Sequence, residues 1–131
     1  MVRNPEIPKL RLLAVALATM LLALMAACSP TDSGVEGHIT AGPNCPVVRV
    51  DVPCPDRPFQ GTLTVLAADG RTRVAMVSAD AAGYYRLNLA PGTYVLHPVS
   101  PAILPRAADV TIVVRRHEFT VQDIVYDTGI R

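Results

Sequence analysis

The sequence predicts an all-β domain, an antiparallel β-sandwich of about seven strands, preceded by an N-terminal signal helix. Two observations support the sandwich. From residue 34 onward, short runs rich in β-branched and aromatic residues alternate polar and apolar positions, and turn-forming residues separate these runs at regular intervals. No segment in this part repeats its apolar residues with a sustained helical period. Two sheets with one apolar face each are then expected to pack together around one core.

The first 27 residues have the features of a secretory signal. Arg3, Lys9 and Arg11 make the start of the chain net positive, and residues 12–27 form an uncharged, largely apolar run that ends in small residues. As a helix this run would extend about 24 Å, less than the roughly 30 Å of a membrane hydrocarbon core. The signal therefore predicts export, and the remaining residues are expected to fold outside the cytoplasm.

The end of the apolar run resembles a bacterial lipobox. Residues 24–28 have the sequence LMAAC, with Met25 where the family usually has leucine. The resemblance implies cleavage before Cys28, attachment of a diacylglyceryl group to its thiol and often acylation, for example by palmitate, of the new amino terminus. Two or more chains give stable anchoring, and the polar residues 28–33 would form a flexible tether. The alternatives are an ordinary secretory signal or a retained membrane helix, with Cys28 incidental.

The strands of the first half follow from local alternation and turn chemistry. A first strand is expected at residues 37–40, before a proline-rich stretch. Residues 61–67 alternate, with Leu63 and Val65 on one face. The Ala-Asp-Gly sequence of residues 68–70 is a turn signal, so residues 73–77 are expected to return as the antiparallel partner strand.

The second half supplies the remaining strands. They are expected at residues 84–89, 93–97, 110–114 and 119–126. The proline-spaced segment 98–105 cannot hold a central strand. In the last strand the apolar residues change phase, because Phe119 and Val121 have odd numbers whereas Ile124 and Tyr126 have even ones. This change predicts a bulge near residues 122–123 that absorbs one extra residue.

The segment from residue 80 to residue 96 carries a recognisable spacing, Asp-x-x-Gly-x-Tyr-x-Leu-x-Leu-x-Pro-Gly-x-Tyr-x-Leu. It resembles the carboxypeptidase regulatory-like domain, a relative of the Cna-B-type and transthyretin-like (prealbumin) modules. The Gly-x-x-Gly-x-Ile spacing that starts at residue 34 and the hairpin of residues 61–77 fit the same family. The resemblance implies a prealbumin-type sandwich over residues 34–131 and says little about function.

Cys45 and Cys54 lie close together in the proline-rich stretch after the first strand. Export makes a disulfide the expected state of this pair. Closing a ten-residue loop would stabilise the fold by about 2.7 kcal/mol in the chain-entropy model. One alternative is a metal site that adds His38 or His97, although the cysteine spacing is unlike that of common zinc sites. The other is a redox pair, although Cys-x-x-Cys is absent.

Motifs for catalysis are missing from the sequence. There is no His-Glu-x-x-His, no His-x-x-Glu and no Gly-x-Ser-x-Gly. The Tyr-Arg-Gly-Ser motif of transthyretin-like hydroxyisourate hydrolases is also missing, and no lysine follows residue 27 to form the Lys–Asn isopeptide of Cna-B modules. We therefore expect no enzyme, no cofactor and no metal. Nine arginines and ten acidic residues after residue 27 leave no basic field for nucleic acid.

The expected function is a non-enzymatic, lipid-anchored cell-envelope module for adhesion, scaffolding or partner binding. Its partners would be the membrane, through lipid on Cys28, and an envelope protein. The alternative is a small-ligand or metal-binding lipoprotein that assists a transporter or an envelope enzyme, with a hydrolase third. Candidate surface residues concentrate charge, turn residues or an exposed aromatic ring, although structural Asp–Arg contacts or loop ends would look the same: Asp56, Arg57, Tyr84, Asp127 and Arg131.

Overall fold

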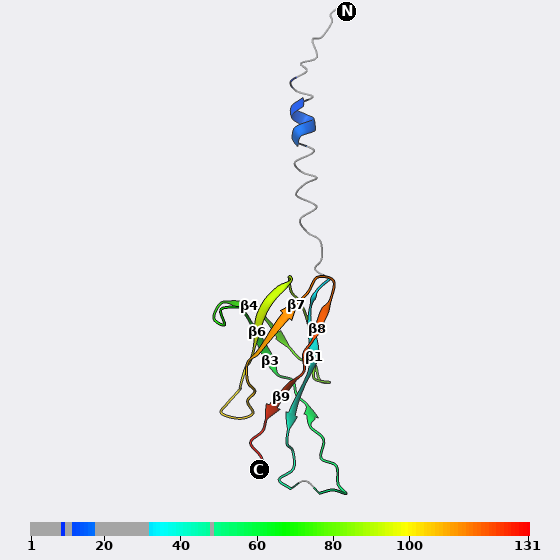
Figure 1. The fold of residues 1–131 in the computed structure, drawn as a ribbon, viewed down its shortest axis with the longest axis vertical. Helices are drawn as coiled ribbons and strands as arrows, with labels where there is room; N and C mark the ends of the chain where they lie inside the picture. Colours follow the sequence, from blue (N-terminus) through cyan, green and yellow to red (C-terminus); the bar gives the residue numbers. More distant parts are fainter. Residues whose placement is uncertain (1–8, 10–11, 18–31, 48) are drawn as a thin grey trace, which may run out of the picture. The chain divides into compact units, whose positions relative to one another are not determined.

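The structure, a computed structural model, describes residues 9, 12–17, 32–47 and 49–131 (Figure 1). The chain divides into two compact units, Met1–Pro30 and Thr31–Arg131, and the strands lie in the second. Residues 12–17 of the predicted signal are helical, whereas Cys28 lies outside the described residues. Within the described part of the chain, no helix is both long enough and apolar enough to cross a membrane.

The described part of the second unit contains nine strands. The seven predicted strands are all present, and the last of them is divided into two pieces. A two-residue strand, β2, was not predicted. The strands are β1 (Gly34–Gly42), β2 (Arg57–Pro58), β3 (Thr62–Ala67), β4 (Arg73–Ser78), β5 (Tyr84–Asn88), β6 (Gly92–Pro98), β7 (Val110–Val114), β8 (Phe119–Val121) and β9 (Ile124–Asp127).

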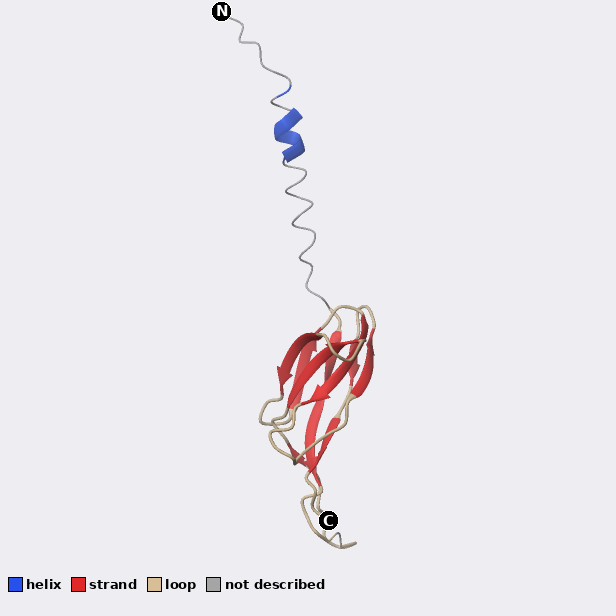
Figure 2. Ribbon diagram, turned by 90° about the vertical axis from the view of Figure 1, so that its left-hand side faces the viewer, coloured by secondary structure: helices blue, strands red, loops and turns tan. Residues whose placement is uncertain are grey.

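Two sheets pack face to face, as Figure 2 shows. In the first sheet β1 is central, with β5 and β2 paired along one side and β8 and β9 along the other. The second sheet has the order β4-β3-β6-β7, and all its pairs are antiparallel. The predicted all-β sandwich is therefore confirmed.

The prediction of purely antiparallel pairing is wrong for the last two strands, because β8 and β9 run parallel to β1. The reason is where the chain changes sheets. β7 ends beside the start of β1, and the turn at residues 115–118 passes directly into β8; the N–H of Gly34 donates to the carbonyl of Glu118 at 3.2 Å. Since β8 enters the first sheet at the end where β1 begins, the two strands point the same way.

The predicted bulge at residues 122–123 is an interruption of a different kind. The ladder with β1 does break there, between β8 and β9. However, Val121 pairs with Glu36 and Ile124 pairs with Ile39, so two residues separate these pairs in both strands. No extra residue is inserted, and the register is the same on both sides of the break.

Three contacts account for this break. The buried Tyr85 hydroxyl donates to the carbonyl of Gln122, which turns that carbonyl away from the ladder. The Asp123 side chain accepts a hydrogen bond from the N–H of His38 at 2.8 Å. Gly37 makes room, because a Cβ at this position would overlap the Gln122 carbonyl oxygen. The interruption therefore comes from packing across the sandwich rather than from strand length.

Because the register is unchanged, Phe119 and Val121 lie on the outer face of the first sheet. The predicted change of phase therefore does not occur. Val121 is 69% exposed, and the Arg86 guanidinium covers the Phe119 ring, 3.5 Å from its centre. The inward positions of this last segment are the even-numbered ones, of which Ile124 and Tyr126 are buried.

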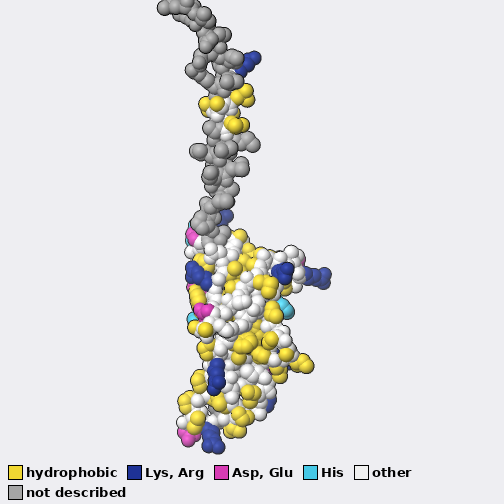
Figure 3. All heavy atoms as spheres, turned by 180° about the vertical axis from the view of Figure 1, so that it is seen from behind, with side chains coloured by type: hydrophobic (Ala, Val, Ile, Leu, Met, Phe, Trp, Pro, Cys, Tyr) yellow, Lys and Arg dark blue, Asp and Glu magenta, His cyan; other side chains and the backbone are white. Residues whose placement is uncertain are grey.

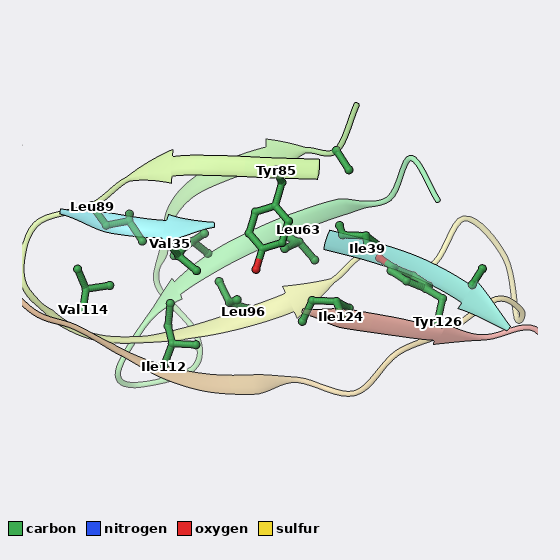
Figure 4. Close-up of a cluster of buried hydrophobic side chains, with 13 residues drawn as sticks. Val35, Ile39, Leu63, Tyr85, Leu89, Leu96, Ile112, Val114, Ile124 and Tyr126 are labelled. Atoms are coloured by element: carbon green, nitrogen blue, oxygen red, sulfur yellow. The ribbon is translucent and has the colours of Figure 1, made fainter. Parts of the chain in front are cut away.

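The core lies between the two sheets and draws residues from both of them (Figure 4). The hydroxyl of the buried Tyr126 has hydrogen-bond partners: it lies 3.0 Å from the carbonyl oxygen of Val99 and 3.3 Å from that of Thr62. The core is therefore apolar with its hydroxyls hydrogen-bonded, as buried polar groups require. Its buried members are Val35, Ile39, Ala41, Leu63, Val65, Ala79, Tyr85, Leu89, Leu96, Ile112, Val114, Ile124 and Tyr126.

The turn before β5 gives a physical reason for part of the recognised spacing. The Asp80 carboxylate accepts hydrogen bonds from the N–H groups of Ala82 and Tyr84, both at 2.9 Å. Gly83 has φ +77°, a conformation that other residues rarely adopt, and a Cβ there would overlap the Ile39 carbonyl oxygen. The aspartate and the glycine therefore form the turn that feeds β5 into its place beside β1.

Candidate functional site

The structure does not bring the five predicted surface residues together. Arg57 and Asp127 belong to strands that pair with the last two residues of β1. Asp56 lies there as well, with its carboxylate directly over the last residue of β1. Tyr84 instead pairs with His38, roughly 10 Å back along the strand. The remaining member, Arg131, lies with the first group because it is bonded to Asp127.

Asp127 is held mainly by the residues that follow it. Its Oδ2 atom lies 2.8 Å from Nη2 of Arg131, and its Oδ1 atom accepts the N–H of Gly129 at 2.8 Å. Arg131, then Gly129 and more weakly Arg106 lower the pKa of Asp127 to about 2. The carboxylate therefore stays ionised at ordinary pH and folds the C-terminal residues back onto β9. This is the structural Asp–Arg contact that the sequence left open.

An open groove of about 460 Å³ lies beside Asp127. It is lined by Ala107, Ala108 and Val125, and by the charged residues Arg106 and Asp127. The Arg106 guanidinium makes no hydrogen bond or ion pair within the described residues, although its positive charge contributes to the lowered pKa of Asp127. Since Arg131 already neutralises Asp127, the groove keeps one uncompensated positive charge over small apolar side chains.

Tyr84 belongs to a separate network on the outer face of the first sheet. Its hydroxyl donates to Oε2 of Glu36 at 2.9 Å, and Arg86 forms an ion pair with the same carboxylate. The Arg86 guanidinium also covers the Phe119 ring, a cation–π arrangement. Tyr84 is half-buried, not exposed as expected, and because the charges of this network satisfy one another it belongs to a structural cluster.

The disulfide between Cys45 and Cys54 is confirmed. The bond leaves neither sulfur as a thiolate, so the alternative of a metal site at this pair is wrong. The side chain of Asn44 closes the base of the loop, with Nδ2 3.0 Å from the carbonyl of Ala41 and 3.2 Å from that of Pro55. The disulfide and this amide therefore constrain the loop, which extends past the end of β1 (Figure 1).

The disulfide-closed loop presents apolar side chains to solvent, a feature that the sequence analysis missed. Residues 49–52 form its turn, in which the N–H of Val52 donates to the carbonyl of Arg49 at 3.3 Å. Val47, Val50 and Val52 are all exposed. The signal was present in the sequence as repeated valines inside a short Cys-to-Cys loop, which is too constrained to turn them all toward a core.

Two further segments add exposed apolar side chains at the same end of the domain. The loop after β6 carries Ile103, which is 88% exposed, and Leu104, and the C-terminal residues carry Ile130. A backbone bridge between Arg106 and Asp127 joins these segments, with N–O distances of 3.1 and 2.7 Å. Apolar side chains from three separate parts of the chain therefore gather here.

We call this region the distal end, because the chain enters the domain at Gly34, at the opposite end of β1. It comprises residues 45–47, 49–54, 99–106 and 127–131. In Figure 3, hydrophobic side chains at the lower end of the domain lie among arginine and acidic side chains. Gathered apolar exposure that is rimmed by charge typically marks an interaction surface. The distal end is therefore the strongest candidate for a functional site.

The histidines have local partners. Nδ1 of His97 lies 2.7 Å from Oδ1 of Asp109, and His117 is bonded to Asp32. The ring of His38 packs against a neighbouring tyrosine, with 5.5 Å between ring centres. Across the residues that the structure describes, no three His, Cys, Asp or Glu side chains gather as metal ligands would.

Comparison with known proteins gives similarity in fold alone. No family model matches the chain, and no curated protein sequence matches it. Among solved structures, the fold is similar to that of a minor pilin of the gram-positive pathogen Streptococcus agalactiae, with a TM-score of 0.53 and 13% sequence identity. It is also similar to the Bacillus anthracis TIE protein, with a TM-score of 0.50 and 16% identity.

These similarities cover most of this chain but a smaller part of the other proteins. Each spans 73% of this chain, against 44% of the minor pilin and 17% of the TIE protein. The shared part is thus one β-sandwich within a longer polypeptide. This supports the sandwich architecture and leaves the activities of the longer proteins outside the comparison.

Proposed function

We propose that the chain is a lipoprotein of the cell envelope, anchored through Cys28, whose β-sandwich is a non-enzymatic module for adhesion, scaffolding or partner binding. The domain would lie outside the cytoplasm, on the extracellular or periplasmic side of the cell membrane. Binding would occur through the distal end. The observation that carries the proposal is the placement of the exposed apolar loops at the end of β1 farthest from Gly34.

This placement suits a tethered binding module. β1 has nine residues, so the two ends of the domain are separated by roughly 30 Å. A lipid on Cys28 would hold the end that contains Gly34 near the membrane, which leaves the distal end directed at other molecules. The disulfide also supports export, because such bonds persist in oxidising compartments.

The charged residues support a structural rather than a catalytic role for the domain. Asp127 is bound by Arg131, and Glu36 is bound by Arg86. Burial raises the pKa of the hydroxyls of Tyr85 and Tyr126, and both hydroxyls donate to backbone carbonyls. These groups are engaged in holding the fold together.

The anchor can be tested in the native host by metabolic labelling with an alkyne-bearing palmitate. The wild-type chain is expected to incorporate the label and to stay in the membrane fraction, and globomycin is expected to leave unprocessed precursor. Cys28→Ala is expected to lose the label. Replacing Cys45 and Cys54 together by alanine is the matched control, since it removes the two disulfide-bonded cysteines and should keep the label. An unlabelled, soluble wild-type protein would defeat the proposal.

A small-ligand function has one observation in its favour, the groove beside Arg106. The groove is open to solvent, whereas ligand sites usually enclose most of the ligand surface. Its single uncompensated cation would suit a small anion. Isothermal titration with short carboxylates would detect such binding, and the absence of heat would leave the partner-binding proposal as the better account.

A further inference from the structure

β4 is an edge strand whose outer side has no partner strand. In the order β4-β3-β6-β7 it pairs with β3 alone (Figure 1). The N–H of Ala79, directly after β4, donates to the carbonyl of Gly61 at 2.9 Å. Because residues of an antiparallel pair alternate between bonded and non-bonded positions, Val77 also bonds to β3. The backbone groups of Met76 and Ser78 therefore point to the free edge, where no described residue bonds to them.

The edges at β5 and β7 are protected, as sheet edges in natural proteins usually are. On β5, the N–H of Tyr84 donates to the Asp80 side chain, and the carbonyl of Tyr84 accepts the N–H of Asp80, both at 2.9 Å. The charged Arg86 occupies the next edge position of β5. On β7, the carbonyl of Val113 accepts the Thr120 hydroxyl at 2.7 Å.

β4 has no comparable protection over its last residues. Its pairing with β3 shifts between Val65 and Leu66, so the irregularity lies at the start of β4. Beyond it, Met76 is 51% exposed on the outer face, and the inward-facing Val77 is only half-buried although it packs against the core. A regular, free edge with apolar side chains on both faces is a template for pairing with another strand.

We propose that β4 pairs with β4 of a second copy of this chain, antiparallel about a two-fold axis at Val77. Met76 of each copy then lies opposite Ser78 of the other, and each such pair exchanges both of its backbone hydrogen bonds. The two Val77 side chains meet on the inner face and cover each other. The second sheets of the two copies become one continuous sheet.

The charges at the two ends of β4 favour this antiparallel arrangement. At its start lie Arg71 and Arg73 with Asp69, so two arginines against one aspartate leave a net positive charge. The turn after β4, residues 79–83, carries the exposed Asp80 as its single charged residue. Antiparallel pairing places the positive end of each copy beside the negative end of the other, whereas parallel pairing would place like ends together.

The direction of β4 determines where the two lipid anchors lie. Gly92, the first residue of β6, pairs with Val114, just before the turn that bonds to Gly34, and Ala67 of β3 pairs with β6 two residues later. β4 therefore begins at the Gly34 end of the domain and runs away from it. In the antiparallel pair the Gly34 ends point in opposite directions, so the two lipids enter different membranes. This inference rests on the proposed anchor at Cys28, and it makes the adhesion a contact between identical chains on two membranes.

Vesicle clustering tests the pairing with the full-length lipoprotein in phosphatidylcholine vesicles. Wild-type vesicles are expected to cluster and to scatter more light, because each weak pair is repeated many times across the contact. Met76→Lys is expected to lower the clustering about tenfold, because it places like charges close together on the paired edge. Val113→Lys is the matched control and should change nothing, since Val113 is similarly exposed, at 55%, on the outer face of β7.

Disulfide formation tests the register. Two vesicle populations carry the same variant with different affinity tags, so a disulfide that joins both tags has formed between membranes. Val77→Cys is expected to join the tags under mild oxidation, because the two side chains lie directly opposite each other. Ala75→Cys is the matched control on the same face. Its two copies would lie roughly 13 Å apart along the pair, too far for a disulfide, so its yield should be about tenfold lower.

The outcomes separate this inference from the proposed function. Wild-type chains that float with the vesicles without clustering them overturn the pairing between membranes and leave the lipid anchor standing. Clustering that survives Met76→Lys, or equal disulfide yields from Val77→Cys and Ala75→Cys, overturns the β4 pair. Chains that fail to float with the vesicles overturn both the anchor and this inference.

Discussion

Tyr85 shows how one residue can determine the course of a distant strand. Its ring is 1% exposed, and its hydroxyl donates to the carbonyl of Gln122, 37 residues later. Burial, with a further contribution from the charge of Asp123, raises the pKa of this hydroxyl, so it remains a donor throughout the ordinary pH range. The bond therefore ties β5 to the break between β8 and β9.

Replacing Tyr85 by phenylalanine is expected to lower the free energy of unfolding by about 1–3 kcal/mol, because the Gln122 carbonyl loses its buried donor. Urea denaturation measures the change. Tyr94→Phe is the matched control: its hydroxyl donates to the carbonyl of Ala90 at an exposed position, where water can replace it. Equal losses in the two variants would contradict the role given to the buried bond.

At the scale of elements, the disulfide-closed loop between Cys45 and Cys54 is an addition to the sandwich rather than a part of its core. Its described valines are exposed, and its disulfide closes a loop between cysteines nine positions apart. The two β1 residues nearest the loop are instead held by β9. Loss of the disulfide should therefore leave the sheets in place.

Replacing Cys45 and Cys54 together by alanine is expected to lower the free energy of unfolding by about 2.7 kcal/mol at most, the value that loop-closure entropy allows. Thermal unfolding measures this loss, and the far-UV circular dichroism spectrum at 25 °C should still be that of a β protein. Val50→Ala, which keeps the disulfide and changes an exposed side chain, should have little effect. An unfolded double variant would show that the loop supports the core.

The existence of the strands and the hairpin pairing of β3 with β4 followed from local pattern, whereas the pairing of the last strands with β1 did not. The alternation at residues 61–67 and 84–89 predicted β3 and β5, because successive side chains of a strand point to opposite faces and the pattern is visible in consecutive residues. The two-residue β2 was missed because two residues carry no period. The break at residues 122–123 was misassigned because its cause, the Tyr85 hydroxyl, lies in another strand.

At the scale of the whole molecule, the sandwich begins before its first strand. Ser33, which falls within the predicted tether, is 2% exposed. Its hydroxyl donates to the carbonyl of Leu89 at 2.8 Å, and its own carbonyl accepts the N–H of Leu89 at 3.0 Å. These bonds join the entry of the chain to the end of β5.

A fragment of residues 32–131 is therefore expected to unfold at the same urea concentration as the full-length chain. A fragment of residues 34–131 should lose about 1–3 kcal/mol of unfolding free energy, because the Leu89 backbone groups lose their partners. Denaturation of the two fragments side by side measures the difference. Equal stability would place the start of the domain after Ser33.

The sequence by itself determined the fold class, the positions of seven strands, the turn built on Asp80 and Gly83, and the disulfide. Each of these depends on residues within about ten positions of one another, where side-chain alternation and backbone preference act directly. Only the tertiary structure decided that β8 and β9 run parallel to β1, that Phe119 faces outward, and that three loops join at the distal end. Those features depend on which end of one sheet the chain leaves and where it enters the other, and local pattern does not encode that crossing.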